Sequence, residues 1–367
     1  MPLLEEGQTI RDTYEVERFL GEGAFAEVYR VKHRFLGRQA MKVFKRVGMS
    51  LDDIHDMLGE ASLLSRIGHP NIVRVFDANV LETPRGTCGY FTMENVAGGS
   101  LDKFWRSHGG RLVPTEITLD LVKQVCRGIA QAQGEKPPII HRDIKPQNIL
   151  VGYEAEGLRA RVSDFGLAKK VNPLTLLATA AGTLAFKSPE AFSDQKGDSC
   201  AGDVWAIGVT LYLLLTDHLP FEMPENVNWG SKNLFDRALV PPSEFNLDAD
   251  RFLDGIVFKA LQKRAVDRYP TAKELLIALD GWQPAPPRKP TKKPKMLSSE
   301  ASKIALNMAS PLDDELAQEL IQKAFRTRQA GHLAEAADLM EEAFNKSPDL
   351  RKRYANQVKL WRCGISM

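Results

Sequence analysis

The sequence predicts an α+β chain with two lobes, a β-rich small lobe followed by a helical large lobe, and a small all-α module at its C-terminal end. Three observations predict this arrangement. Apolar and polar residues alternate along much of residues 14–44, which is typical of strands. Residues 119–132 show helical apolar spacing, and 206–215 are continuously apolar, as in a buried core helix. A basic, proline-rich stretch then precedes more helical spacing, so we expect domains at 14–282 and 299–367 joined by a linker at 283–298.

Composition limits the class of protein. The chain has 367 residues and a formal net charge of +2, which does not call for nucleic acid or an anionic membrane as a partner. Its four cysteines have no paired C-x-x-C spacing, which argues against a zinc site or a disulfide framework. The first residues lack the pattern of a signal peptide, and no apolar stretch has membrane-spanning length. We therefore expect a cytoplasmic protein with no membrane span.

A glycine-rich turn joins the first two predicted strands. Gly21 and Gly23 would let backbone N–H groups approach phosphate oxygens, and Phe25 at the tip would cover them. An ordinary turn is the alternative, because a lone G-x-G pattern is weak. The full candidate loop comprises Gly21, Glu22, Gly23, Ala24 and Phe25.

Residues 140–150, Ile-His-Arg-Asp-Ile-Lys-Pro-Gln-Asn-Ile-Leu, and residues 163–166, Ser-Asp-Phe-Gly, carry the richest chemistry. Asp143 could accept a hydroxyl proton and Lys145 could neutralise a phosphate, while Asn148 and Asp164 could hold Mg²⁺ through oxygen atoms. Phosphoryl transfer needs chiefly an aligned hydroxyl and cations on the phosphate oxygens, because its transition state is loose. These are requirements that the side chains of the two motifs can meet.

The order His-Arg-Asp, Lys, Asn and then Asp-Phe-Gly resembles the catalytic core of the eukaryotic-like protein kinase family, and the lysine after the aspartate resembles its serine/threonine branch. The resemblance implies a bilobal fold and transfer of the ATP γ-phosphate to Ser or Thr hydroxyls of a protein substrate, including autophosphorylation. It implies Mg²⁺ as the metal, with Mn²⁺ as the alternative. Lys42 looks like the family's third-strand lysine, which an ion pair with Glu60 would orient on the α and β phosphates.

The same resemblance places the rest of the nucleotide pocket. Backbone groups of Glu94 and Val96 would hold the adenine edge, Met93 would guard the back pocket and Ser100 could reach the ribose. Ala26 stands where the family usually has a third glycine. An apolar slot for the purine ring would be formed by Val28, Ala40 and Leu150. Core packing alone would explain these last three residues equally well.

Residues 182–190, Gly-Thr-Leu-Ala-Phe-Lys-Ser-Pro-Glu, resemble the end of the family's activation loop. The resemblance implies structural roles here: Thr183 would contact the catalytic loop, Glu190 would pair with Arg268, and Asp203 would support the catalytic-loop backbone.

Arg142 beside the base suggests that a phosphate orders the activation loop, because an arginine there needs an anion. Thr175 and Thr179 are the candidate phosphosites. The loop is also unusually apolar, so packing as an inhibitory helix or against a partner is an equal alternative.

The C-terminal residues Gly331, Ala336, Met340 and Pro348 resemble the second half of a tetratricopeptide repeat, with a generic helical hairpin as the alternative. One repeat has too little core to stand alone. We therefore expect the module to dock on the large lobe, to dimerise or to bind a partner.

Two other functions compete with an active protein kinase. A pseudokinase scaffold would act through the helical module, but the predicted catalytic side chains are all present in the sequence. A small-molecule kinase would usually lack a segment like 182–190. If the chain is bacterial, family habit implies a cognate metal-dependent protein phosphatase as a partner.

Overall fold

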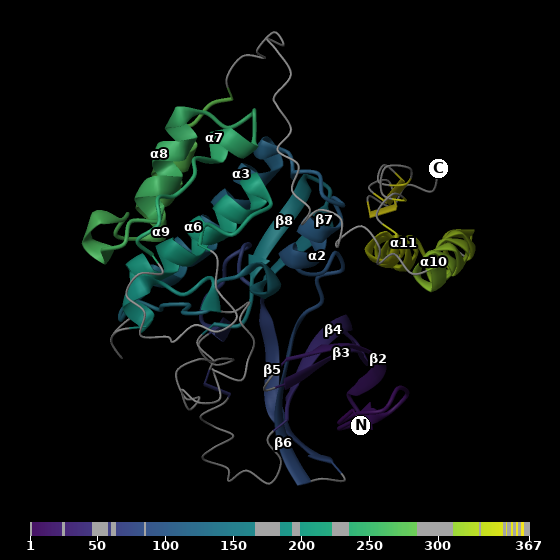
Figure 1. Ribbon diagram of the computed structural model, residues 1–367. Coiled ribbons are helices and arrows are strands. Elements are labelled where there is room, and N and C mark those ends of the chain that lie inside the picture. Colours follow the sequence, from purple (N-terminus) through teal and green to yellow (C-terminus); the bar gives the residue numbers. More distant parts are fainter. Residues whose placement is uncertain are drawn as a thin grey trace.

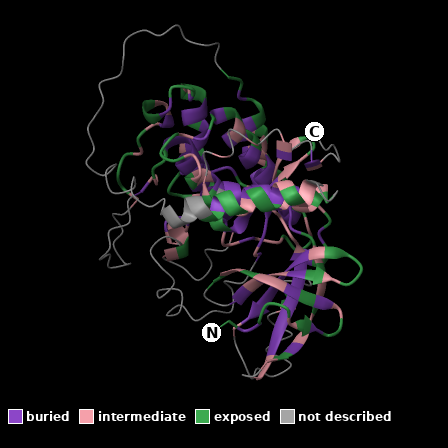
Figure 2. Cartoon of the chain, turned by 90° about the vertical axis from the view of Figure 1, so that its right-hand side faces the viewer, coloured by how far each residue is buried: buried purple, intermediate pink, exposed green. Residues whose placement is uncertain are grey.

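The computed structural model describes residues 2–23, 26–45, 58–59, 64–83, 86–165, 184–192, 199–221, 235–284, 311–329 and 332–347, and of the last helix residues 350, 354, 357–358 and 361–362. Within this part of the chain a strand-rich lobe lies next to a helical lobe (Figure 1). The predicted bilobal α+β architecture is confirmed. Figure 2 shows buried residues along the strands and between the helices.

The small lobe is an antiparallel sheet with the strand order β1-β2-β3-β4-β6-β5. Its strands are β1 (Thr9–Ile10), β2 (Tyr14–Glu22), β3 (Ala26–His33), β4 (Gly37–Phe44), β5 (Val75–Thr83) and β6 (Gly86–Glu94). Side chains alternate between its two faces, as strand geometry requires. Tyr29 and Val31 join one buried core, whereas Val28, between them and the turn, packs with a second cluster on the opposite face. This second face borders the large lobe and positions the site.

The large lobe is built on two long helices, α3 (Thr115–Gln133) and α6 (Cys200–Thr216). Both predicted helices are therefore confirmed, and α6 is buried along nearly its whole length. The remaining described elements are α2 (Leu101–Arg106), the hairpin β7 (Ile149–Glu154) and β8 (Gly157–Val162), α7 (Pro242–Phe245), α8 (Arg251–Ala260), α9 (Ala272–Asp280), and short 3-10 turns at Pro146–Asn148, Pro189–Phe192 and Ala265–Asp267. The hairpin lies between the residues of the two chemical motifs.

The chain between the lobes is fixed to this hairpin. The Val151 N–H donates to the Gly99 carbonyl at 2.8 Å, and the Val73 N–H donates to the Val162 carbonyl at 3.0 Å. A Cβ at Gly98 would lie 2.1 Å from the Val151 carbonyl oxygen, so only glycine fits there. The connection between the lobes and the floor of the site are therefore held in one register.

Gly128 on α3 gives a first testable prediction. A Cβ there would lie 2.7 Å from the Asn71 carbonyl oxygen, which belongs to backbone that is itself hydrogen-bonded to β8. We expect Gly128→Ala to destabilise the protein by about 1–3 kcal/mol through overpacking, although alanine is the better helix former. Gly255, in the middle of α8, is the matched control because a Cβ there meets nothing within 4 Å. Gly255→Ala should raise stability by about 0.5–1 kcal/mol. Thermal unfolding measures both variants, and equal shifts of their unfolding temperatures would contradict the packing argument.

The C-terminal module contains α10 (Pro311–Gln329), α11 (Leu333–Lys346) and helical residues of a third segment. Its core includes Ala336, Met340, Ala343 and Trp361, which agrees with the apolar faces seen in the sequence. The tetratricopeptide likeness and the domain boundaries stay predictions. Ion pairs join α11 to β2 and β4 of the small lobe. The basic side chains that contact α11 lie on the small lobe, and docking on the large lobe or on a partner stays a prediction.

The part of the chain that the structure describes contains no helix with the length and apolarity needed to cross a membrane.

Candidate active site

The predicted base lies among hydrogen-bonding partners from its own loop. The Lys145 Nζ is 2.8 Å from the Asp143 Oδ2, and the Asn148 Nδ2 donates to the Asp143 main-chain oxygen at 2.8 Å and to its Oδ2 at 2.9 Å. Lys145 is extended and Pro146–Asn148 forms a 3-10 turn, so the chain turns back and brings all three side chains to one place. This arrangement leaves a carboxylate beside a cation.

Asp164 lies opposite this loop, at the end of β8, and forms an ion pair with Lys42 of β4. Burial alone would raise the pKa of Asp164, but the charge of Lys42 beside it holds that pKa below its ordinary value, so the carboxylate is ionised. Asp164 has φ 62° and Arg142 has φ 70°, a left-handed backbone that non-glycine residues adopt at some cost. Residues with this backbone conformation cluster at functional sites, and contacts around them must hold them in place.

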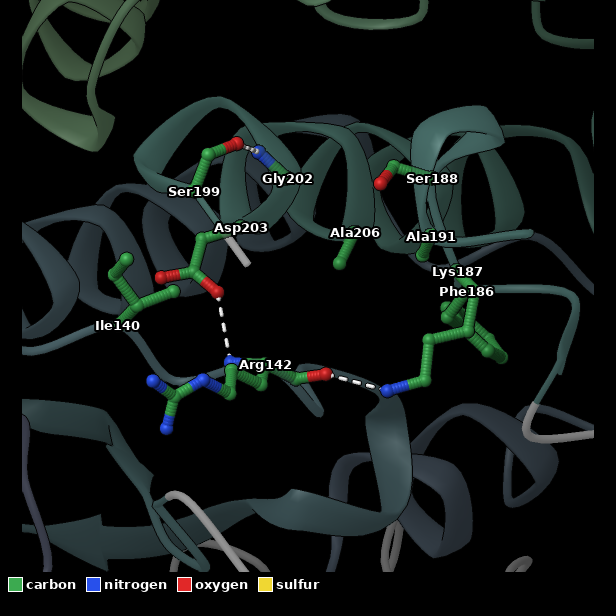
Figure 3. Close-up of a pocket in the computed structure, with 10 residues that line it drawn as sticks. All are labelled: Ile140, Arg142, Phe186, Lys187, Ser188, Ala191, Ser199, Gly202, Asp203 and Ala206. Atoms are coloured by element: carbon green, nitrogen blue, oxygen red, sulfur yellow. Dashed lines mark hydrogen bonds between the residues drawn. The ribbon is translucent and has the colours of Figure 1, made fainter. Parts of the chain in front are cut away.

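The catalytic-loop backbone is held from two sides. The Asp203 carboxylate, on the first turn of α6, accepts hydrogen bonds from the His141 and Arg142 N–H groups, each at 3.0 Å. The Lys187 Nζ donates to the Arg142 carbonyl at 2.6 Å. Figure 3 shows these two contacts reaching the Arg142 peptide from opposite directions, in a small pocket between the loop and α6. The left-handed Arg142 is thereby fixed in place.

His141 is fully buried beneath this loop. It accepts the Asp143 N–H at Nδ1 (3.2 Å), so its Nε2 carries the proton and donates to the Ser163 carbonyl at 2.8 Å. Burial lowers the pKa of His141 below its ordinary value, which keeps the ring neutral. The ring also packs against Phe165, with the centroids 4.5 Å apart. His141 therefore links the loop that carries the base to the strand end that carries Asp164.

The predicted purine slot is brought together on the second face of the small-lobe sheet. Ala40, Met93 and Phe91 belong to one buried cluster, and Val28 and Leu150 pack against it. The Gly23 N–H donates to the Ala26 carbonyl at 2.8 Å and closes the glycine-rich turn. The predicted slot residues of the small lobe therefore pack together with Leu150 of the large lobe.

Other predicted pocket residues make contacts that the sequence did not reveal. The Ser100 hydroxyl accepts the Lys103 N–H at 3.3 Å and thus caps α2. The Glu94 N–H is taken by the Arg74 carbonyl at 2.9 Å, and the Glu94 carboxylate lies 3.0 Å from the Arg161 Nε. The Glu22 side chain forms a surface ion pair with Lys45 at 3.1 Å. Reasoning from the motifs missed Lys187 as a second cation, 3.9 Å from the Asp143 Oδ1, although it stands in segment 182–190.

Several predicted site residues lie outside the described residues, and the structure brings no information on them. They are Ala24, Phe25, Glu60, Thr175, Thr179 and Thr183.

The expected large-lobe ion pair is present and bidentate. The two Arg268 Nη atoms lie 2.7 Å from the two Glu190 carboxylate oxygens. Arg268 is almost fully buried, stacks 4.9 Å over the Trp205 ring and donates to the Gln262 carbonyl at 2.7 Å. It therefore ties the 3-10 turn Pro189–Phe192 to the core around α6.

This pair predicts acid sensitivity. Burial alone would raise the pKa of Glu190, but Arg268 lowers it below its ordinary value. A depressed folded-state pKa means that the pair stabilises fully above the unfolded pKa of about 4.5, and that this contribution is lost as the pH falls through the folded pKa.

We expect Glu190→Gln to lower stability by about 3 kcal/mol at pH 7, because Arg268 stays buried without its partner charge. Below pH 4.5 the free energy of unfolding of this variant should fall less steeply with pH than that of the wild type. The control is Asp236→Asn, at an ion pair with Lys263 in which both side chains are 50% exposed. It should change stability by less than about 1 kcal/mol. Urea unfolding at pH 7 and pH 4 measures both, and equal effects would contradict the role of the pair.

The donor set suits Mg²⁺ held together with phosphates. Asp164 supplies an ionised carboxylate, and Asn148, whose Nδ2 is used by Asp143, has its amide oxygen as a ligand atom. Mg²⁺ typically takes one or two such protein oxygens and completes its shell with phosphates and water. The described residues hold no cluster of three or more His, Cys, Asp or Glu side chains suited to a metal.

Comparison with known proteins identifies the family. The family model described as "Protein kinase domain" matches residues 14–278. A probable serine/threonine-protein kinase of Clostridium perfringens is 31% identical over 278 residues, covering 75% of this chain and 39% of that protein. Serine/threonine-protein kinase PknB of Mycobacterium tuberculosis is 30% identical over 336 residues, covering 88% of this chain and 51% of that protein. The chain thus spans about two fifths to half of the length of these relatives.

Among solved structures, the PknI kinase domain of Mycobacterium tuberculosis has a similar fold, with a TM-score of 0.55 and 24% identity. The match covers 76% of this chain and 98% of that one. The family model spans most of the chain and both described lobes, and Lys42 of the small lobe pairs with Asp164 of the large lobe. The chain therefore belongs to the protein kinase domain family.

Proposed function

We propose that this chain is an ATP-dependent serine/threonine protein kinase, with Mg²⁺ as its metal and Mn²⁺ as the alternative. The observation that carries the proposal is the meeting of Asp143 and Lys145, 2.8 Å apart, with Asn148 and the Lys42–Asp164 pair between the lobes. The named relatives are serine/threonine-protein kinases, which supports the same substrate class.

Each side chain has a distinct part in this proposal. Asp143 accepts the proton of the attacking hydroxyl, and Lys145 offsets negative charge on the transferring phosphoryl group. Lys42, 5% exposed on β4, forms an ion pair with Asp164, and in this proposal its ammonium group binds the α and β phosphates. Asn148 and Asp164 would hold Mg²⁺, which when bound neutralises charge on the β and γ phosphates. Asp203 and Lys187 keep the loop in the geometry that aims Asp143.

The first experiment is mass spectrometry of the purified full chain after incubation with Mg-ATP and a generic protein substrate. Phosphate on serine or threonine of either protein supports the proposal, and an Asp143→Asn chain treated alike shows whether a contaminating kinase is responsible. A chain that binds Mg-ATP but transfers no phosphate would favour the pseudokinase scaffold. Phosphate found only on small molecules would favour the small-molecule kinase.

We expect Thr175→Ala/Thr179→Ala to lower activity toward an added protein by about 10-fold or more while leaving the Kd for Mg-ATP nearly unchanged. The reason is that a phosphate on the loop would bind the cations of Arg142, Lys169 and Lys170, and this binding would order the loop. Peptide mapping of the active wild type tests the premise. Full activity without phosphate at either threonine would favour the packed apolar loop instead.

We further propose a cytoplasmic location and a docking or regulatory role for the C-terminal module, toward a partner or the kinase domain itself. A cognate protein phosphatase would reverse autophosphorylation if the chain is bacterial. Co-purification from the source cells, with the Asp143→Asn chain as bait, tests for such partners.

A further inference from the structure

Three arginines form a row on the small-lobe sheet, next to the predicted purine slot. Arg18 of β2 pairs in register with Arg30 of β3, and Arg38 lies on the neighbouring strand β4. We call Arg18, Arg30 and Arg38 the arginine row. No step of the proposed phosphoryl transfer uses these side chains.

Strand alternation places the row on the same face as the slot. Residues two apart on a strand point to the same side. Arg30 is two residues from Val28, and Arg38 is two residues from Ala40; both apolar residues belong to the slot cluster. The arginine row therefore continues the nucleotide-binding face of the sheet outward from the slot.

The row is short of negative charge within its own lobe. Among the described residues of the small lobe, Glu17 is the acid that contacts the row, with its Oε2 2.6 Å from the Arg30 Nε and 2.9 Å from the Arg38 Nε. Burial, followed by the charge of Arg18, lowers the pKa of Arg30. Three cations beside one carboxylate leave an excess of positive charge at this surface, which further anions would stabilise.

Helix α11 supplies those anions from one of its faces. Glu335, Asp338 and Glu342 are spaced i, i+3 and i+7, which puts them side by side on a helix. The apolar residues of α11, including Ala336, Met340 and Ala343, pack inside the module. The acidic face is therefore available without unfolding the module.

Each acid of this face contacts the row. Glu342 forms an ion pair with Arg18. The Arg38 guanidinium uses its Nη2 for Glu335 at 3.2 Å and its Nη1 for Asp338 at 3.4 Å, while Glu17 holds its Nε. Asp338 is oriented from behind by Arg362, 2.5 Å away. A guanidinium bound on several sides has a defined orientation, unlike a single exposed ion pair.

We infer that the acidic face of α11 is an intrachain clamp that docks on the arginine row and couples the C-terminal module to the nucleotide pocket. A single surface ion pair contributes little binding free energy, but here three pairs act together. Because the helix belongs to the same chain, it competes with outside anions at a roughly millimolar effective concentration. Because β3 and β4 carry residues of both the row and the slot, and β2 pairs with β3, a docked module restrains the strands that border the nucleotide slot. The coupling part rests on the proposed function, whereas the docking part does not.

A zero-length carbodiimide cross-link in the full chain tests the docking. This reagent joins an amine to a carboxylate only at contact, so Arg38→Lys should become linked to Glu335 or Asp338, and Arg18→Lys to Glu342. The native pairs Lys45–Glu22 and Lys263–Asp236 report that the reagent works. Arg34→Lys, at an exposed arginine of the same lobe, is the matched control and should give no link to α11.

Peptide mapping decides the outcome. Links from either variant to α11 that fall severalfold in 1 M salt support the clamp, because salt screens such pairs. Native-pair links with none to α11 from either variant would overturn it. Mixing with ¹⁵N-labelled chain identifies the source of the helix. Links between labelled and unlabelled chains would place a second copy on the row and reject an intrachain clamp.

A second measurement tests the coupling. Glu335→Gln/Asp338→Asn/Glu342→Gln removes the acids from the row with little change in shape, and Glu319→Gln at an exposed acid of α10 is its control. The triple variant should change the Kd for a non-hydrolysable Mg-ATP analogue by about fivefold or more, the usual size of a coupling between sites. An unchanged Kd would reject the coupling. If the wild type itself did not bind the analogue, the proposed function would fail while the cross-link result would stand.

Discussion

Asp143→Asn is expected to lower the rate of phosphoryl transfer by about 10²–10⁴-fold, the usual contribution of a general base, while the Kd for Mg-ATP changes little. The amide has the same shape and can still contact Lys145 and Asn148, which lie 2.8 Å and 2.9 Å from the Asp143 Oδ2. It cannot accept the hydroxyl proton. Single-turnover kinetics at saturating Mg-ATP, beside equilibrium binding of the nucleotide, measures the two quantities separately.

The control is Asp248→Asn, at an exposed aspartate far along the chain from the site, which should keep wild-type rates. Turnover of the Asp143→Asn variant within about twofold of wild type would remove Asp143 from the proposed role as base.

Asp164→Asn is expected to lower the rate by about 10³-fold or more through a different failure, because the metal contributes several kcal/mol of charge stabilisation. The variant loses an ionised metal ligand and the carboxylate that forms an ion pair with Lys42. We therefore expect a much higher Kd for Mg-ATP, in contrast to the Asp143 variant.

Titration with Mg²⁺ and Mn²⁺ separates the two variants. Excess metal should recover part of the activity of Asp164→Asn and none of that of Asp143→Asn. Equal metal dependence in wild type and Asp164→Asn would show that Asp164 does not hold the metal.

The elements that sequence predicted best are those with a local signal. α6 is a continuous apolar run and α3 has clear helical spacing, and both form as expected. The catalytic loop is a contiguous motif, so Asp143, Lys145 and Asn148 could be named together. The bidentate contact of Glu190 with Arg268 was expected through family resemblance, since no local pattern joins residues so far apart.

Other contacts had no signal in the sequence. The Ser100 hydroxyl serves as a helix cap, which a ribose contact would have to share. No sequence pattern distinguishes Lys187, and only the fold brings its Nζ within 3.9 Å of the Asp143 Oδ1. The pairing of the arginine row with α11 joins residues about 300 positions apart, 300 in the case of Arg38 and Asp338. Such contacts depend on tertiary packing, which spacing along the chain does not encode.

The anchoring of the catalytic loop has a consequence for synthesis. His141 is held by Asp203, 62 residues later, and Arg142 by Lys187, 45 residues later. A ribosome adding about 5–20 residues per second exposes the loop roughly 3–12 s before Asp203 follows it. During that interval the nascent chain carries the base, the lysine and the metal ligand of the loop without the helix that aligns them. If the proposed function holds, the growing polypeptide is expected to transfer no phosphate until α6 emerges and docks.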